Sequence, residues 1–252
     1  AMFDRGFTDG LPVVPPTEAR VLRMLQGTHR SPDDIVAVVP PDLVPVTVEK
    51  VAVNAVMAGC KPEYLPWVIA AVEAVCNDTF NIHGVLATTM PVGPVIVCNG
   101  PGTRAIGMNS GMNVFGQGNR ANLTIGRAVQ LIIRNVGGGR PGEVDRATHG
   151  NPGKISFCFA EDEVGSPWTS LAVSRGVAAG VDDGVLDDAV EREHQLAAQF
   201  AGQTIQCESV VGEKGASGQL RRRLHADQLV SAKYWDADGA ADALRRRQRR
   251  SD

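Results

Sequence analysis

The chain has 252 residues, 43% hydrophobic content and a formal net charge of −3, values that are typical of a globular protein and give no sign of nucleic-acid binding. No apolar run reaches the roughly 18 residues that a membrane helix needs, and the acids and glycines near the first residues predict no signal peptide. Because the five cysteines are far apart and form no C-x-x-C pair, we expect reduced thiols, no zinc ribbon and a cytoplasmic protein.

The first part of the chain predicts an extended segment, a helix and a strand. Two consecutive prolines exclude a helix interior in the stretch 7–17 (FTDGLPVVPPT), which we call the N-terminal arm. Thr17 is predicted to cap a helix over 18–26. The β-branched run 35–39 predicts a short buried strand.

The strongest helix pattern lies in residues 47–76, where two apolar stripes are separated by a glycine-cysteine step. Gly59 ends the first predicted helix and Pro62 begins the second. Cys60 therefore lies just before a predicted helix N-terminus, whose free N–H groups and dipole favour a thiolate. This makes Cys60 the candidate nucleophile or proton donor, and the alternative is a small cysteine buried between two helices.

The middle of the chain predicts strands that alternate with helices. The apolar runs 82–89 and 92–98 are predicted strands, and a long glycine-rich loop follows over 100–118. A helix is predicted over 121–136 and a further strand over 155–160. This order predicts an α/β fold: a layered sheet with helices packed on it and long Gly-rich loops.

The character of the sequence changes beyond about residue 175. We predict an α/β core domain over 1–175 and a helical, polar, partly disordered C-terminal region over 176–252, with one helix over 186–200. The basic run at 245–250 (RRRQRR) is interpreted as a solvated terminus, with a nucleic-acid or partner-binding arm as the alternative.

A glycine pattern at 116–121 (GQGNRA) opens the predicted helix 121–136, where free N–H groups and the helix dipole favour an anion. No strand leads into the pattern and no acid follows about twenty residues later, so a dinucleotide site is the weaker interpretation. A purely structural glycine loop is the other alternative. The candidate substrate-binding residues are Gly116, Gly118, Asn119, Arg120, Asn122 and Arg127.

His149 and Lys154, in a loop rich in glycine and proline, are the candidate proton donors or acceptors. His83 is expected to be a core residue, and Asn54 a solvated residue at the edge of its helix. The acidic run 161–163 follows a predicted strand, but it lacks the companion ligands of a metal site and favours a surface turn. We predict no metal site, and the sequence specifies no cofactor.

Four long motifs together resemble a bacterial family whose members look like partners of proteins with a selenocysteine-or-cysteine-Gly-Ser-Cys (UGSC-type) motif. The resemblance spans about residues 4–175 and includes TDGLPVVPPT at 8–17, the helical pair at 48–75, Asn-Gly-Pro at 99–101 and the stretch 118–138. It implies a link to thiol or selenol chemistry on a small molecule, with this chain as one subunit of a two-protein enzyme. The chain carries no such redox motif of its own.

Three hypotheses for function follow. The first is an oxidoreductase or lyase, or a subunit of one, that acts on a small anionic metabolite by thiol-assisted chemistry. The second is a non-catalytic partner of a thiol or selenol redox protein, and the third is a nucleotide-binding oxidoreductase. Because glycine-rich loops beside apolar helices often form subunit interfaces, we also expect a homo-oligomer.

Overall fold

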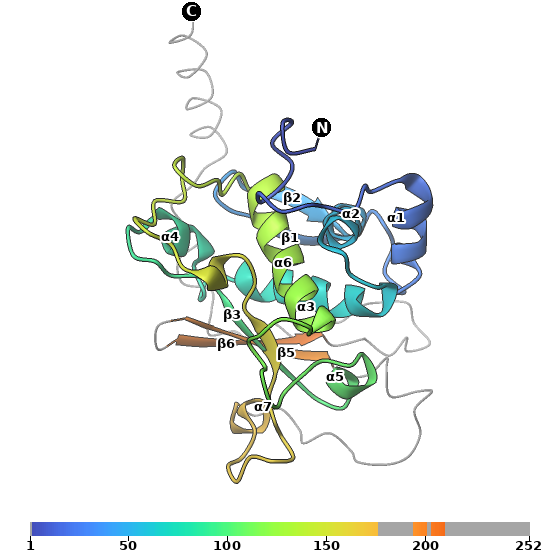
Figure 1. Ribbon diagram of the computed structural model, residues 1–252, viewed down its shortest axis with the longest axis vertical. Coiled ribbons are helices and arrows are strands. Elements are labelled where there is room, and N and C mark those ends of the chain that lie inside the picture. Colours follow the sequence, from blue (N-terminus) through green and yellow to red (C-terminus); the bar gives the residue numbers. More distant parts are fainter. Residues whose placement is uncertain (1, 176–193, 201–202, 210–252) are drawn as a thin grey trace, which may run out of the picture. The chain divides into compact units, whose positions relative to one another are not determined.

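The computed structural model describes residues 2–175, 194–200 and 203–209, and within them it shows a mixed α/β fold (Figure 1). The helices are α1 (Glu18–Leu25), α2 (Val48–Ala58), α3 (Leu65–Val75), α4 (Ile82–Ala87), α5 (Gly102–Ala105), α6 (Arg120–Asn135) and α7 (Leu171–Ser174), with 3-10 turns η1 (Pro62–Tyr64) and η2 (Pro152–Lys154). The strands are β1 (Ile35–Val39), β2 (Val44–Thr47), β3 (Val95–Asn99), β4 (Cys158–Ala160), β5 (His194–Phe200) and β6 (Gln203–Ser209).

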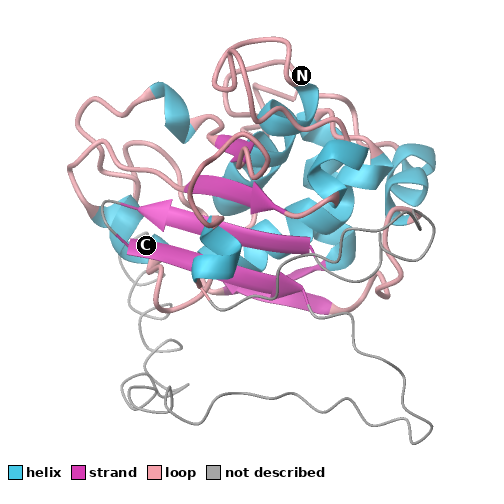
Figure 2. Cartoon of the chain, turned by 90° about the horizontal axis from the view of Figure 1, so that it is seen from below, coloured by secondary structure: helices cyan, strands magenta, loops and turns pink. Residues whose placement is uncertain are grey.

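The described strands form two small sheets, drawn in magenta in Figure 2. Strands β1 and β2 pair antiparallel. The other sheet has the order β4-β3-β5-β6, in which β3 and β4 are parallel and the remaining pairs are antiparallel. Because β3 and β4 are parallel, the loops that follow them leave the sheet at the same edge.

Helices α2, α3 and α6 form the centre of the apolar core. Nine of the eleven residues of α3 are buried, because this helix is apolar on nearly all sides. Helix α6 is amphipathic and turns its apolar face to α2, α3 and β4. Helices α2 and α6 belong to two of the motifs that carry the family resemblance, and they contact each other in the fold.

The helical pair predicted over 47–76 is confirmed. The hydroxyl of Thr47 accepts a hydrogen bond from the Lys50 N–H, and α2 ends at Gly59 in the left-handed conformation (φ +91°). The Cys60 N–H then donates to the Ala55 carbonyl at 3.0 Å, which closes the last turn. Pro62 begins the second helix as predicted, but its first turn is the 3-10 turn η1 and α3 follows.

The predicted strand over 82–89 is wrong, because residues 82–87 form helix α4. Its N-cap is Asn81, whose side-chain oxygen accepts a hydrogen bond from the Gly84 N–H at 3.1 Å. Ile82, Val85 and Leu86 are buried at helical spacing, so a short apolar run that suited a covered strand equally suited one face of a helix.

Two further element boundaries differ from the prediction. Of the helix predicted over 186–200, residues 186–193 lie outside the described residues and 194–200 form strand β5. Of the strand predicted over 155–160, only Cys158–Ala160 is a strand. The helix predicted over 121–136 is confirmed as α6, shifted by one residue at each end.

Strand β1 exists at the predicted position but is not buried along its length. Only Val39 is buried, whereas Ile35 and Val38 are exposed. Strand β1 pairs with β2 alone in the described sheet, so its other edge has no strand beside it.

By compactness the chain divides into Ala1–Val211 and Gly212–Asp252, and every described residue lies in the first unit. Strands β5 and β6 continue the sheet of β3 beyond residue 175, where we predicted the core domain to end. The basic run 245–250 lies outside the described residues. In the described part of the chain, no helix has both the length and the apolar character needed to cross a membrane.

Candidate functional site

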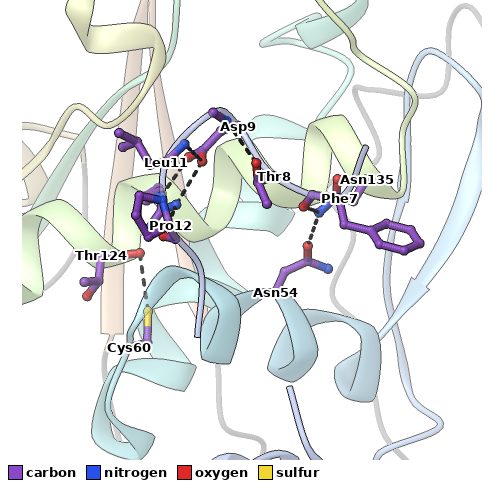
Figure 3. Close-up of polar contacts among 11 residues, drawn as sticks. Phe7, Thr8, Asp9, Leu11, Pro12, Asn54, Cys60, Thr124 and Asn135 are labelled. Atoms are coloured by element: carbon purple, nitrogen blue, oxygen red, sulfur yellow. Dashed lines mark hydrogen bonds and ion pairs between the residues drawn. The ribbon is translucent and has the colours of Figure 1, made fainter. Parts of the chain in front are cut away.

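Cys60 lies in the contact between the end of α2 and helix α6. Its side chain is 8% exposed, and its thiol donates a hydrogen bond to the Thr124 carbonyl oxygen at 3.3 Å (Figure 3). Burial raises the pKa of Cys60 from its ordinary value of 9.0 to about 12, and the charges of the nearby Arg120 and Arg127, which favour the thiolate, do not offset it. Cys60 is therefore a neutral thiol at physiological pH.

The expectation that a helix N-terminus favours the thiolate form of Cys60 is therefore wrong. The 3-10 turn η1 separates Cys60 from α3, so the first N–H groups of the α-helix lie several residues further along the chain. Removal of the thiol from water is the dominant effect on its pKa.

The structure brings Cys60 and the start of α6 together. Arg120, the first residue of α6, donates from Nε and Nη2 to the Gly59 carbonyl oxygen at 3.2 and 3.0 Å. Arg120 is exposed, and two of its five N–H groups account for these bonds. Of the candidate substrate-binding arginines, it therefore retains donors toward solvent.

Arg127 is paired with the N-terminal arm. Its Nε and Nη2 atoms donate to the Asp9 carboxylate at 2.7 and 2.8 Å, and Nη2 also donates to the Pro12 carbonyl oxygen at 2.9 Å. Burial alone would raise the pKa of Asp9, but the hydrogen bonds and charge of Arg127 outweigh it and lower that pKa. The side chains of Arg127 and Asp9 are 13% and 14% exposed, so this bidentate pair holds the arm against α6.

Two asparagines anchor the same arm and its helices. Asn54 is buried, contrary to the expectation of a solvated residue, and its side-chain oxygen accepts a hydrogen bond from Asn135 at 2.9 Å. Asn135 also donates to the Phe7 carbonyl oxygen at 3.2 Å, as Figure 3 shows. Side-chain amides thus connect α2, α6 and the arm.

The candidate glycine loop is held by asparagines at the start of α6. Asn119 donates from its amide to the Asn113 and Gly116 carbonyl oxygens at 2.9 and 3.2 Å. Asn122 is buried and makes two hydrogen bonds of 3.0 Å with the backbone N–H and carbonyl of Asn109. Gly118 has a φ of +93°, and a Cβ at Gly116 would collide with the Asn113 side chain. These residues shape the loop, and their amide groups are engaged in doing so.

The segment before Gly116 is the loop that follows α5, and it is not a strand. The strand, loop and helix of a dinucleotide-binding site are therefore not formed around the 116–121 pattern.

His149 and Lys154 are not joined to Cys60 by a contact in the described residues. His149 is exposed. Lys154 forms an ion pair with the buried Asp145 at 3.0 Å and donates to the Val92 carbonyl oxygen at 3.2 Å. Lys154 therefore holds its own loop to the start of the segment that leads into β3.

A polar cluster that the sequence did not single out lies where the parallel strands β3 and β4 end. Asn99 is buried and donates from its amide to the Glu161 carboxylate at 2.5 Å. Glu161 also accepts from the Leu171 N–H at 2.8 Å, and Glu163 accepts from the Gly100 N–H at 2.7 Å. The two adjacent signals were the Asn-Gly-Pro turn and the acidic run, each placed after a strand.

These carboxylates bind backbone and amide donors. Among the described residues, no group of three or more histidine, cysteine, aspartate or glutamate side chains has the arrangement to hold a metal ion. The acidic run 161–163 therefore shapes the turns after β3 and β4, in line with a structural turn.

Exposed apolar side chains surround this end of the sheet. We call the segments 100–118 and 161–170 the strand-end loops. Met112 is 95% exposed and Trp168 is 80% exposed, and Phe115 and Val164 are also exposed. The Phe115 ring packs edge-on against Phe157 and Phe159, with ring centroids 5.1 and 4.9 Å apart, which holds this part of the loop against β4.

Comparison of the sequence with protein-family models, with curated proteins and with solved structures gives no match.

Proposed function

We propose that this chain is a non-catalytic subunit of a thiol- or selenol-dependent enzyme, and that the reactive group belongs to a partner protein. The observation that carries the proposal is the Cys60 thiol, which is buried and donates to the Thr124 carbonyl oxygen inside the α2–α6 contact. A nucleophile needs a thiolate and access to its substrate, and this environment opposes both.

The surroundings of Cys60 support the same interpretation. Arg127 neutralises Asp9, and Lys154 pairs with Asp145, so these two cations stabilise the fold. The amides of Asn119 and Asn122 bind the backbone of the glycine-rich loop. Most candidate substrate-binding groups thus have structural partners within this chain.

The strand-end loops provide the surface on which we expect the partner to bind. Their exposed methionine, phenylalanine and tryptophan side chains are residue types enriched at protein interfaces. The partner chemistry comes from the resemblance, which links this chain to proteins with a UGSC-type motif. A homo-oligomer, also predicted from the sequence, would use the same kind of surface.

The proposal includes a layered arrangement of the α/β fold. The contacts of α6 with β4 and of α3 with β5 support it, because they place helices against strands of the four-stranded sheet. In this arrangement the strand-end loops project from one edge of the sheet and are free to meet a partner.

Thiol labelling of the folded chain tests whether the Cys60 thiol is buried and neutral. We expect iodoacetamide to modify Cys60 at least about 100-fold more slowly in the folded chain than in the unfolded chain, because the thiol is neutral and buried. Half-buried Cys76 is the internal reference in the same digest. If Cys60 is the fastest of Cys60, Cys76, Cys98 and Cys158 to react, the proposal is overturned.

Binding tests the second half of the proposal. The purified chain is mixed with a purified protein that carries a Cys-Gly-Ser-Cys motif, and the mass of the product is measured by light scattering after size exclusion. We expect a complex whose mass is the sum of whole numbers of both subunits. Two separate species at high micromolar concentration would contradict a partner of this chemistry.

A second candidate function is thiol-assisted catalysis by this chain, and one observation favours it. The exposed Arg120 donates a hydrogen bond to the carbonyl oxygen of Gly59, the residue before Cys60, and the Cys60 thiol bonds to Thr124 on the same helix as Arg120. Fast labelling of Cys60, with loss of activity in Cys60→Ser, would support this alternative over the first proposal.

A further inference from the structure

Two buried thiols lie in contact on the neighbouring strands β3 and β4. The sulfur atoms of Cys98 and Cys158 are 3.8 Å apart, close to the separation of two sulfur atoms in nonbonded contact. Cys98 is fully buried and Cys158 is 5% exposed. The two residues are 60 positions apart in the chain.

The register of the sheet is what brings these sulfurs together. Cys158 lies opposite Ile96 in the parallel pair. Because side chains alternate along a strand, Cys98 projects from the same face as Ile96 and therefore from the same face as Cys158. The Glu161 N–H donates to the Cys98 carbonyl oxygen at 2.9 Å, so the residue after β4 is hydrogen-bonded to β3 beside the thiols.

The two strands leave room for a small adjustment. A disulfide bond has an S–S length of about 2.05 Å, so the two sulfurs would have to approach by about 1.8 Å, and because Cys98 lies two residues beyond the strand partner of Cys158 the backbone of β4 must shift as well. Strand β4 has three residues and lies at the edge of the described sheet, with β3 as its one neighbour. Such an edge strand shifts more easily than a central one.

We propose that Cys98 and Cys158 form a redox-active dithiol, which a hydroperoxide oxidises reversibly to a disulfide that joins β3 to β4. This inference does not depend on the proposed function, because it concerns two thiols that the proposal leaves unused.

The oxidation has two balanced steps. The Cys158 thiol loses its proton and its sulfur attacks one peroxide oxygen; the O–O bond breaks and the leaving oxygen takes up that proton, so the products are a sulfenic acid and an alcohol, or water when the oxidant is hydrogen peroxide. The sulfur of Cys98 then attacks the sulfenic sulfur, the S–S bond forms, the S–O bond breaks and water leaves with the Cys98 proton. Two thiols lose two electrons in total and one peroxide gains them.

The order of these steps follows from accessibility. Cys158 is as buried as Cys60, so it reacts only when the edge strand β4 opens locally, and it reacts before Cys98 because β3 is an internal strand of the sheet. Burial raises the pKa of Cys98 well above its ordinary value, and the adjacent Cys158 raises it further, so Cys98 stays a thiol until the sulfenic acid forms beside it. We expect the pair to react more slowly than an exposed oxidisable residue such as Met112.

The disulfide would act on the turns that follow the two strands. Asn99 is adjacent to Cys98, and its amide donates to Glu161, which is the residue after β4. A covalent bond between the strands would fix the distance across which this hydrogen bond forms. Oxidation would therefore change the hydrogen-bond distances in the polar cluster at the ends of β3 and β4.

The test is disulfide mapping of the full chain after treatment with hydrogen peroxide under native conditions. Remaining thiols are blocked with iodoacetamide during unfolding, and the chain is digested without reductant. We expect one linked peptide pair that contains Cys98 and Cys158, a loss of two free thiols per chain, and full recovery of both thiols with dithiothreitol. Oxidation of Met112 to its sulfoxide, in the same digest, shows that the peroxide dose was sufficient.

Matched variants complete the test. Cys158→Ala is expected to abolish the linked pair, and Cys76→Ala, which changes a half-buried cysteine elsewhere in the core, is expected to leave it unchanged. Three outcomes would overturn the proposal: a different cysteine pair, sulfinic acid at Cys158 without a link, or free Cys98 and Cys158 in a sample whose Met112 is fully oxidised. Because the wild-type chain is the primary sample, a variant that fails to fold does not affect the result.

Discussion

The N-terminal arm and the strand-end loops are both irregular segments, yet they place their polar and apolar groups in opposite ways. The arm turns Asp9 inward to Arg127 and offers its backbone carbonyls to α6. The strand-end loops turn their carboxylates and amides to their own backbone and leave Met112 and Trp168 almost fully exposed.

The difference separates two roles that a sequence pattern can suggest for the same residues. Polar side chains that are paired within the chain stabilise its fold, and their loss is measured in the free energy of unfolding. Apolar side chains held at the surface contribute little to that free energy and are available to a partner. Substitutions in the arm should therefore change the free energy of unfolding, and substitutions in the strand-end loops should change the affinity for a partner.

The largest effect is expected from the ion pair of the arm. Arg127→Met keeps an apolar stem but leaves the Asp9 carboxylate, whose side chain is 14% exposed, without its cation, which should lower the free energy of unfolding by about 2 kcal/mol. Urea denaturation of both chains measures the difference. The matched control is Arg30→Met, whose ion pair with Glu73 has the same N–O distance of 2.7 Å but is half-buried, and which should cost less than about 1 kcal/mol. Equal losses in the two variants would contradict a structural role specific to the arm.

The second effect concerns the asparagines of the glycine-rich loop. Asn122→Ala removes the acceptor of the Asn109 N–H and the donor to the Asn109 carbonyl. Because the Asn122 side chain is buried, this should lower the free energy of unfolding by about 2 kcal/mol. Thermal unfolding measures the loss. Asn77→Ala is the control, since the Asn77 side chain bonds the Thr79 N–H at an exposed turn and should matter by less than about 1 kcal/mol. Wild-type stability in Asn122→Ala would show that Asn122 is available to a ligand.

The third effect is a loss of stability at alkaline pH. The pKa of Cys60 is about 12 in the folded chain, against an ordinary value of 9.0, so the unfolded chain releases this proton first. The contribution is fully present below pH 9 and is lost as pH rises toward 12, with a slope of about 1.4 kcal/mol per pH unit for one thiol. Denaturation curves of wild type and Cys60→Ala over this range isolate the slope. Parallel pH profiles would indicate a solvent-exposed thiol and would favour the catalytic alternative.

How much of this could be predicted from the sequence depends on how far apart the interacting residues are. The ends of α2 and the start of the second helix were predictable because Gly59 and Pro62 act within one turn. Helix α4 was missed because its six residues carry an apolar run that satisfies both periods, and its cap, Asn81, was not recognised.

The environment of the candidate site lay beyond local patterns. The thiol of Cys60 meets a carbonyl 64 positions away, and the partner of Arg127 is 118 positions away. The pattern at 116–121 marked a helix start correctly, but whether its arginine and asparagine bind a ligand or the chain itself is decided by tertiary packing. Residue types alone carry no information about which of these partners is closer.

The smallest effect on stability, and the sharpest on binding, is expected from the strand-end loops. Met112→Asp changes a side chain that is 95% exposed, so the free energy of unfolding should stay within about 0.5 kcal/mol of wild type. A charge at this position would be desolvated in an apolar interface, so affinity for a protein with the Cys-Gly-Ser-Cys motif should fall about tenfold or more. Leu22→Asp, at an exposed apolar position of α1, controls for added charge and should leave affinity unchanged. Light scattering of each variant without a partner tests for a homo-oligomer. If Met112→Asp changes the mass of the isolated chain while Leu22→Asp does not, the strand-end loops bind a second copy of this chain and not a different protein.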